Sequence, residues 1–143
     1  MNTANSPPEW SLHPRLEQDS ISIADLPLSR LLLSCDANYP WLLLVPRRVG
    51  ASEIIDLDQA DQAQLMAEID TVSRALKAVT VCDKLNIAAI GNVVPQLHIH
   101  IVARRHDDPA WPKPVWGVVL ARPYDLAEGE SLIAALRHKI GLS

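Results

Sequence analysis

Phenylalanine is absent from this chain of 143 residues, and cysteine clusters, long apolar runs and runs of basic residues are missing as well. Two cysteines cannot build the disulfide framework of a small secreted domain, which favours a reducing, cytoplasmic location. The apolar runs, such as residues 41–45, are far shorter than the roughly 20 residues that cross a bilayer, so a membrane is not an expected partner. Residues 1–8 are polar and proline-rich, lack the apolar stretch of a signal peptide, and are expected to be disordered.

The charge distribution argues against a general nucleic-acid-binding protein. The net charge is −4, and no run of lysine or arginine is longer than two residues. Because nucleic-acid-binding surfaces are usually strongly basic, nucleic acid is not an expected partner. A small anion held by a few local groups is compatible with this charge.

Apolar residues are plentiful enough for one folded domain. They make up 48% of the sequence, and the length fits a single domain over residues 1–143. Without phenylalanine the core should be aliphatic. The largest aromatic surfaces are then the four tryptophans, Trp10, Trp41, Trp111 and Trp116.

The clearest periodicity predicts a long amphipathic helix after Asp58. Five apolar residues recur at helical spacing, namely Leu65, Ile69, Val72, Leu76 and Val79. Polar residues fall between them, so one face should be buried over a length of about 20 residues. Asp58 is a plausible N-cap, because its carboxylate can accept a hydrogen bond from an N–H of the first turn.

Shorter patterns predict a sheet and a second helix. Alternating or apolar runs between turn residues predict strands at 20–24, 28–35, 41–45, 84–90, 96–103 and 115–121. A C-terminal helix is expected at 131–140, and one or two helical turns within 9–18. Because helices and strands are segregated along the chain, we expect an α+β fold with an antiparallel sheet of about five strands.

The segment from Gln96 to Val102 alternates polar and apolar residues without a break. In a strand this alternation places Gln96, His98 and His100 on one face, with side chains roughly 6.5–7 Å apart at about 3.3 Å rise per residue. Two imidazoles would then be neighbours on a rigid element. The turn Gly91-Asn92 precedes the strand and could bring backbone N–H groups near an anion.

Three interpretations of the histidine pair stay open on pattern alone. The first is a solvated strand face that happens to carry histidine. The second is a metal site, which would need further ligands; Asp107 and Asp108 lie beyond two arginines, and neither cysteine has ligand spacing to the pair. The third is nucleophilic attack on phosphorus, since a neutral imidazole is a good nucleophile near pH 7 and a second imidazole can assist it.

At these residues the chain resembles the histidine triad (HIT) superfamily, whose signature is His-φ-His-φ-His-φ-φ with φ apolar. The hairpin that closes in Val45-Pro46-Arg47-Arg48 is similar to the family's strand ending in Val-Ile-Pro-Lys. The long helix, the strand with its Gly-Asn turn and the histidine strand follow in the family's order. The resemblance covers about residues 20–105 and implies a HIT-like fold.

The resemblance also implies an activity. In the family, the middle histidine attacks the α-phosphorus of a nucleoside-phosphate derivative, and water then releases a nucleoside monophosphate. His98 stands at that position, and His100 stands at the third, which contacts the phosphate and the leaving group. Dinucleoside polyphosphates and nucleoside phosphoramidates are the implied substrates of such a hydrolase or transferase. No metal or other cofactor is implied, and a homodimer is expected.

The sequence departs from the family pattern in the residues that support the nucleophile. Gln96 replaces the first histidine of the triad, and Trp41 stands where the family often has another histidine. Asn92 takes the place of the phosphate-loop glutamine, and Val93 that of the Ser or Thr after it. A nucleotide-binding module with little turnover is therefore an alternative function.

Two further residues are weaker candidates for substrate binding. Asp36 ends a strand where the family tends to carry an acidic ribose-binding residue, although an Asx turn in the hairpin is an equally good interpretation. Arg47 could offset the negative charge of the chain near a phosphate, but a solvated pair with Arg48 is the simpler interpretation.

Overall fold

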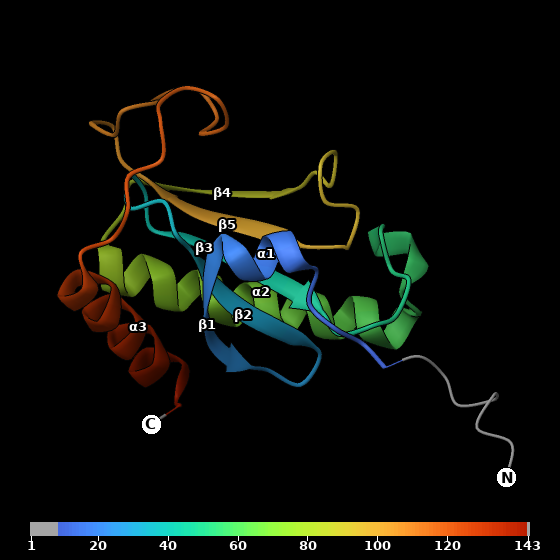
Figure 1. The fold of residues 1–143 in the computed structure, drawn as a ribbon. Coiled ribbons are helices and arrows are strands. Elements are labelled where there is room, and N and C mark those ends of the chain that lie inside the picture. Colours follow the sequence, from blue (N-terminus) through green and yellow to red (C-terminus); the bar gives the residue numbers. More distant parts are fainter. Residues whose placement is uncertain (1–8, 143) are drawn as a thin grey trace, which may run out of the picture.

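The computed structural model describes residues 9–142, so the disorder expected for residues 1–8 lies outside the described part of the chain. The fold is α+β and is built on a five-stranded antiparallel sheet, as predicted (Figure 1). The strand order is β1-β2-β3-β5-β4. The strands are β1 (Ser20–Asp25), β2 (Ser29–Ser34), β3 (Trp41–Pro46), β4 (Lys84–Ala89) and β5 (Ile99–Arg104).

Within residues 9–142, three α-helices and one 3-10 turn accompany the sheet. They are α1 (Pro14–Gln18), η2 (Ile54–Asp56), α2 (Gln59–Thr80) and α3 (Leu126–Ile140). The prediction for α2 is confirmed, and the Asp58 carboxylate accepts a hydrogen bond from the Asp61 N–H at 2.8 Å. No helix within residues 9–142 is both long and apolar enough to cross a membrane.

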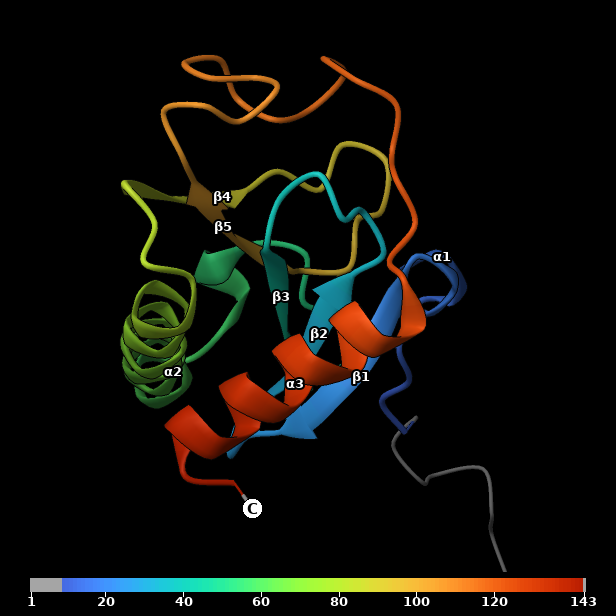
Figure 2. The ribbon, with the colours of Figure 1, turned by 90° about the vertical axis from the view of Figure 1, so that its left-hand side faces the viewer.

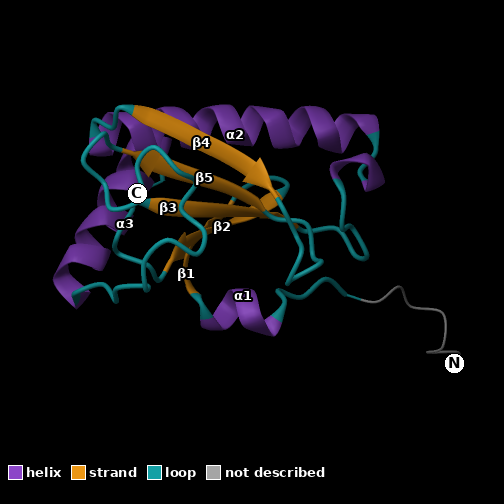
Figure 3. Ribbon diagram, turned by 90° about the horizontal axis from the view of Figure 1, so that it is seen from above, coloured by secondary structure: helices purple, strands orange, loops and turns teal. Residues whose placement is uncertain are grey.

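The helices lie on both faces of the sheet. Figure 3 shows α1 and α2 on opposite sides of the strands, and Figure 2 shows α3 close to α2. The main core lies between the sheet and the pair α2 and α3, and its fully buried members are aliphatic apart from Cys82. A second apolar cluster under α1 joins Leu16 to Leu32, Leu43 and Val94. The face covered by α1 is the one that carries the histidines.

Three of the predicted elements differ from those in the structure. Residues 115–121 form turns rather than a strand, because Gly117 adopts a left-handed backbone with φ +74° and interrupts the extended run. The last helix begins at Leu126 rather than at 131. The histidine strand begins at Ile99 rather than at 96, because the Leu97 N–H donates to the Ala51 carbonyl at 3.0 Å and not to the ladder.

A buried carboxylate ties α2 to the turn between β1 and β2. Glu68 is buried and accepts hydrogen bonds from the backbone N–H groups of Leu28 at 2.7 Å and Ser29 at 3.0 Å. The Gln64 amide donates to the same carboxylate at 3.0 Å. Glu68 therefore satisfies two buried backbone donors that would otherwise lack a partner.

Replacing Glu68 by glutamine should lower the free energy of unfolding by about 2 kcal/mol. The amide of the new side chain would turn one accepting oxygen into a donor that faces a backbone N–H, and hydrogen bonds to a charged acceptor contribute about 1.5–3 kcal/mol. Urea denaturation of both proteins measures the difference. A loss below about 0.5 kcal/mol, the range of surface substitutions, would contradict the role assigned to this carboxylate.

Candidate functional site

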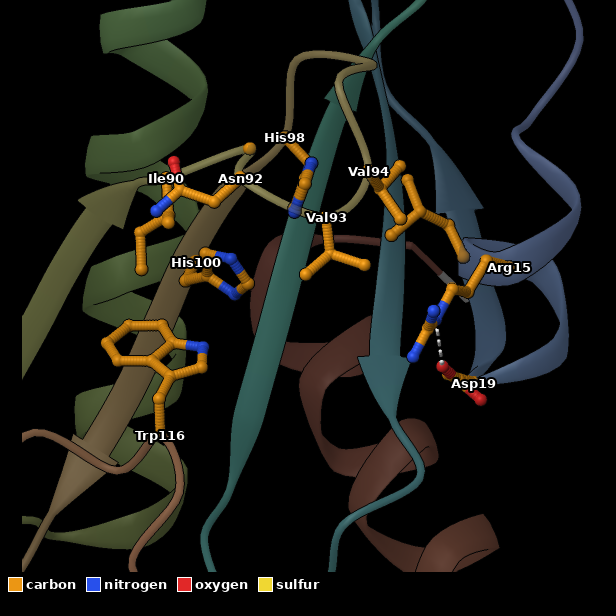
Figure 4. Close-up of a pocket in the computed structure, with 11 residues that line it drawn as sticks. Arg15, Asp19, Ile90, Asn92, Val93, Val94, His98, His100 and Trp116 are labelled. Carbon is orange, nitrogen blue, oxygen red and sulfur yellow. Dashed lines mark ion pairs between the residues drawn. The ribbon is translucent and has the colours of Figure 1, made fainter.

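A pocket of about 260 Å³ opens on the α1 face of the sheet, where α1, the loop before β5 and the loop after β5 meet. Figure 4 shows the rings of His98, His100 and Trp116 along one side, with Arg15 of α1 and Asp19, which follows α1, at the far end. The pocket is lined by Arg15, Leu16, Asp19, Ile90, Gly91, Asn92, Val93, Val94, His98, His100 and Trp116. Both predicted histidines therefore face one cavity.

The protonation pattern of the His98 ring follows from its backbone contact. Its Nδ1 lies 2.7 Å from the Gln96 carbonyl oxygen, which can only accept a hydrogen bond. Nδ1 of a neutral His98 must therefore carry the proton, which leaves Nε2 with a free lone pair. The backbone contact therefore sets both the tautomer and the orientation of the ring.

His100 has the opposite tautomer. The Trp41 indole Nε1–H donates to Nδ1 of His100 at 3.0 Å, and an indole nitrogen has no accepting lone pair. Nδ1 must therefore accept, and Nε2 of the neutral ring carries the proton. The two imidazoles meet edge to face, with centroids 4.8 Å apart. The His98 ring, with its unprotonated Nε2, thus lies beside the His100 ring, whose Nε2–H can donate a hydrogen bond.

Both imidazoles are well shielded from solvent, with 7% of each residue exposed. Burial lowers the pKa of His100 from its ordinary 6.5 to about 4, and repulsion by His98 is the smaller cause. His100 is consequently neutral near pH 7. It can donate a hydrogen bond through Nε2 but carries no positive charge there.

The low pKa of His100 predicts a pH-dependent stability. The unfolded ring takes up a proton near 6.5 and the folded ring only near 4, so the unfolded state binds more protons between these values. The free energy of unfolding should therefore fall by about 3 kcal/mol as the pH drops from about 6.5 to 4. The measurement is urea denaturation across this range, wild type against His100→Gln. If the free energy of unfolding changed with pH in the same way in both proteins, the result would contradict the lowered pKa of His100.

The loop between β4 and β5 forms the floor of the pocket. Gly91 has φ +70°, a backbone conformation that favours glycine, and both Gly91 and Asn92 are among the residues that line the pocket. Ile90, Val93 and Val94 add an apolar surface beside the histidines. The loop can thus offer both backbone polar groups and apolar contact to a ligand.

The sequence did not identify the far wall of the pocket, which comes from α1 and from Asp19 directly after it. Arg15 and Asp19 line this wall and form an exposed ion pair at 3.9 Å. Gln96 ties this part of the chain to the histidine segment, since its side chain accepts from the His13 N–H at 2.8 Å and donates to the Ser11 carbonyl at 2.9 Å. No local pattern in residues 9–19 signals this contact.

Gln96 and Trp41 both lie beside the pocket rather than in its lining. The prediction that Gln96 shares a strand face with the histidines is wrong, because the strand begins three residues later. Its backbone carbonyl contacts His98 while its side chain turns to the N-terminal segment. Trp41 packs behind His100, with ring centroids 5.7 Å apart.

Trp116 reaches the pocket from the loop after β5. Its ring meets His100 edge to face at 5.0 Å and Trp41 at 5.6 Å. Trp111, from the same loop, instead packs on the guanidinium of Arg104 at 5.4 Å. The sequence identified both residues only as two of the four large aromatic side chains, and it did not indicate which one reaches the pocket.

The structure places two predicted substrate-binding residues away from the pocket. The Asp36 carboxylate accepts from the Asn38 N–H at 3.0 Å, which is the Asx-turn arrangement, and it also accepts from the Arg122 N–H at 3.2 Å. Arg47 pairs with Asp25 at 3.0 Å and donates to the Leu26 carbonyl at 2.6 Å. Neither residue lines the histidine pocket.

The described residues do not gather a metal-ligand set. Within residues 9–142, no group of three or more His, Cys, Asp or Glu side chains is placed to hold one ion. His98 and His100 thus form a pair of imidazoles, and the pocket's carboxylate, Asp19, pairs with Arg15. The arrangement fits nucleophile and hydrogen-bond donor better than it fits two ligands of one metal.

The chain is similar to histidine triad proteins in sequence and in structure. A family model of the HIT domain matches residues 15–107. A histidine triad protein of Bradyrhizobium japonicum is 65% identical and superposes with a TM-score of 0.92, over 93% of this chain and 99% of the other. The search of curated proteins found no match.

Two more histidine triad proteins have the same fold over nearly their whole length. The protein from Sinorhizobium meliloti is 42% identical, with a TM-score of 0.89 and coverage of 91% of this chain and 96% of the other. The protein from Marinobacter aquaeolei is 38% identical, with a TM-score of 0.90 and coverage of 94% and 98%.

Proposed function

The chain belongs to the histidine triad family, and from this premise we propose that it is a nucleotide hydrolase or nucleotidyl transferase acting at the α-phosphate. The observation that supports this most directly is the lone pair on His98 Nε2. It is held in place by the contact between Nδ1 and the Gln96 carbonyl. The substrates proposed are dinucleoside polyphosphates and nucleoside phosphoramidates.

The pocket wall suits a nucleotide on chemical grounds. Ile90, Val93 and Leu16 supply apolar surface for the nucleoside, and Arg15 supplies a positive charge in a chain of net charge −4. We assign Asn92 and the Gly91 turn to the phosphate, where backbone N–H groups can meet an anion. Asp36 and Arg47, which lie elsewhere, are left out of this assignment.

The reaction we propose has two steps. His98 Nε2 forms a bond to the α-phosphorus, while the bond from phosphorus to the leaving group breaks and its electron pair stays on the leaving atom. His100 Nε2–H donates a hydrogen bond to a phosphoryl oxygen. Water then attacks phosphorus, the N–P bond breaks, the electron pair returns to Nε2, and one proton of the water passes to solvent.

The proposal is tested by incubating the purified protein with diadenosine polyphosphates and adenosine phosphoramidates and measuring release of AMP. We expect release well above that of a buffer blank. The absence of release from every substrate, in a protein that remains folded, would overturn the enzymatic proposal.

A nucleotide-binding module with little turnover is the second candidate. It is favoured by the side chain of Gln96, which is engaged with the N-terminal segment instead of supporting the His98 ring. Calorimetry would separate the two candidates. Micromolar binding of AMP without hydrolysis of any substrate would favour the binding module, whereas turnover would exclude it.

We also propose a cytoplasmic homodimer. The edge strand β4 has one paired neighbour, β5, and carries exposed Ile87, while Ile90 beyond it is exposed as well. An open apolar sheet edge of this kind favours pairing with a second copy. Size-exclusion chromatography coupled to light scattering would report the mass of the assembly.

The cytoplasmic location that we propose is supported by the cysteines. Both are free, which suits a reducing compartment.

A further inference from the structure

We infer that Trp41 fixes His100 as a hydrogen-bond donor that does not transfer its proton, and that the site therefore selects phosphoanhydrides over phosphoramidates. The inference rests on the proposed function and narrows its substrate class. Trp41 acts through His100 and is thus a positioning residue. The observation behind it is the hydrogen bond of 3.0 Å from the indole Nε1 to His100 Nδ1.

The indole of Trp41 is held firmly in this orientation. Trp41 is the first residue of β3 and pairs with Val102 of β5, two residues along the strand from His100. The Tyr39 ring meets the Trp41 ring edge to face, with centroids 6.4 Å apart. The Trp116 ring, from the loop after β5, also meets it edge to face, with centroids 5.6 Å apart. Since the indole nitrogen can only donate, rotation of a proton cannot change the direction of this hydrogen bond.

This contact opposes a second proton on His100. An imidazolium has two N–H groups, and its Nδ1–H would point at the Trp41 N–H, so protonation would remove a hydrogen bond and set two donors against each other. Burial acts in the same direction and lowers the pKa of His100 to about 4. Near pH 7 the ring holds only its Nε2 proton, whose complete transfer would leave an imidazolate.

The other groups at the pocket offer no better proton donor. The Nδ1–H of His98 is committed to the Gln96 carbonyl. Arg15 and Asp19 pair with each other at 3.9 Å on the far wall, where Asp19 presents an exposed carboxylate. Trp116, the remaining ring against His100, does not titrate. The described lining of the pocket thus holds donors of hydrogen bonds rather than a positioned acid.

The two substrate classes differ in what their leaving groups require. When His98 attacks an anhydride, the P–O bond breaks and the oxygen keeps the electron pair, so a phosphate departs as an anion with a second pKa near 6 and needs no proton. When it attacks a phosphoramidate, the P–N bond breaks and an amine departs whose conjugate acid has a pKa near 10. The amine must gain a proton as the bond breaks, and none of the described residues that line the pocket supplies it.

The tautomer of His100 can be measured without any substrate. Nitrogen-15 NMR of the labelled wild type at pH 7 should show a proton on Nε2 and none on Nδ1 of His100. Trp41→Phe removes the donor and keeps an aromatic ring, so Nδ1 of His100 becomes free to take up a proton at higher pH than in the wild type. A wild-type ring protonated at Nδ1 would overturn the inference whatever the activity.

The selectivity is measured with diadenosine tetraphosphate and with AMP linked to an alkylamine through a P–N bond. We expect kcat/KM of the wild type to be about 10²-fold higher for the anhydride, because a positioned general acid typically contributes 10²–10⁴-fold and is missing here. In Trp41→Phe and Trp41→His the ratio should fall by about tenfold or more, most strongly at pH 5–6. Two variants are measured so that the test still gives a result if one of them does not fold.

The possible outcomes separate this inference from the proposed function. Equal or faster cleavage of the phosphoramidate by the wild type would overturn the inference and leave the hydrolase proposal standing. An unchanged ratio in both variants would overturn the role of Trp41. Cleavage of neither substrate would overturn the proposed function, and the substrate selection with it.

Discussion

Replacing His98 by alanine should lower the release of nucleoside monophosphate by about 10³-fold or more, the scale of losses seen when an attacking side chain is removed. The reason is the single lone pair that the structure assigns to His98 Nε2. The neighbouring His100 cannot replace it, because Trp41 occupies Nδ1 and the free Nε2 carries the proton. The measurement is kcat/KM with the substrate that the wild type cleaves best.

A matched control is available on the same chain. His138 is exposed on α3 and is not among the residues of the pocket. His138→Ala should leave kcat/KM within about twofold, since exposed substitutions away from a site change little. If His98→Ala retained more than a tenth of the wild-type rate while folded, His98 would not be the nucleophile.

The second large expected effect is a loss of folding stability when the buried ion pair of Arg104 and Asp108 is broken. Their side chains are 1% and 6% exposed, with Nε of Arg104 2.7 Å from the Asp108 carboxylate. The same carboxylate accepts from the N–H groups of Ala110 at 3.0 Å and Trp111 at 2.7 Å. The guanidinium and these hydrogen bonds hold the pKa of Asp108 below its usual range, against the raising effect of burial.

Asp108→Ala should lower the free energy of unfolding by about 3–5 kcal/mol, because removing one member of a buried pair leaves an uncompensated charge. The control is Asp107→Ala one residue away. The Asp107 side chain is 78% exposed, and its ion pair with Arg105 should be worth less than about 1 kcal/mol. Urea denaturation of both variants tests this. Similar losses in the two proteins would contradict the assignment.

The sequence predicted those parts of the fold that depend on local periodicity. The helix α2 was found because its apolar residues repeat at helical spacing and Asp58 caps it, and both signals are local. The strand at 115–121 was predicted from its apolar run, but Gly117 adopts a left-handed backbone there. The start of β5 depends on a hydrogen bond from Leu97 to Ala51, 46 residues earlier, which no window of neighbouring residues reveals.

The candidate site, too, could be predicted from the sequence only where local pattern determines it. Alternation along the sequence predicted that His98 and His100 face the same way, and both line one pocket, although His98 lies just before β5 rather than within it. Arg15 and Trp116 were missed as pocket residues because the fold brings them in from segments far from the histidines in sequence. Arg47 was placed near a phosphate from its charge alone, whereas its partner is Asp25.

The most direct test of the central claim is to trap the covalent intermediate. A single-turnover reaction with diadenosine tetraphosphate, quenched in alkali and analysed by peptide mass spectrometry, should show an adenylyl group on the peptide that contains His98. The fragment ions should place it on that ring and not on His100. Turnover of the substrate with no adenylyl group on His98, or with the group on another residue, would contradict the mechanism.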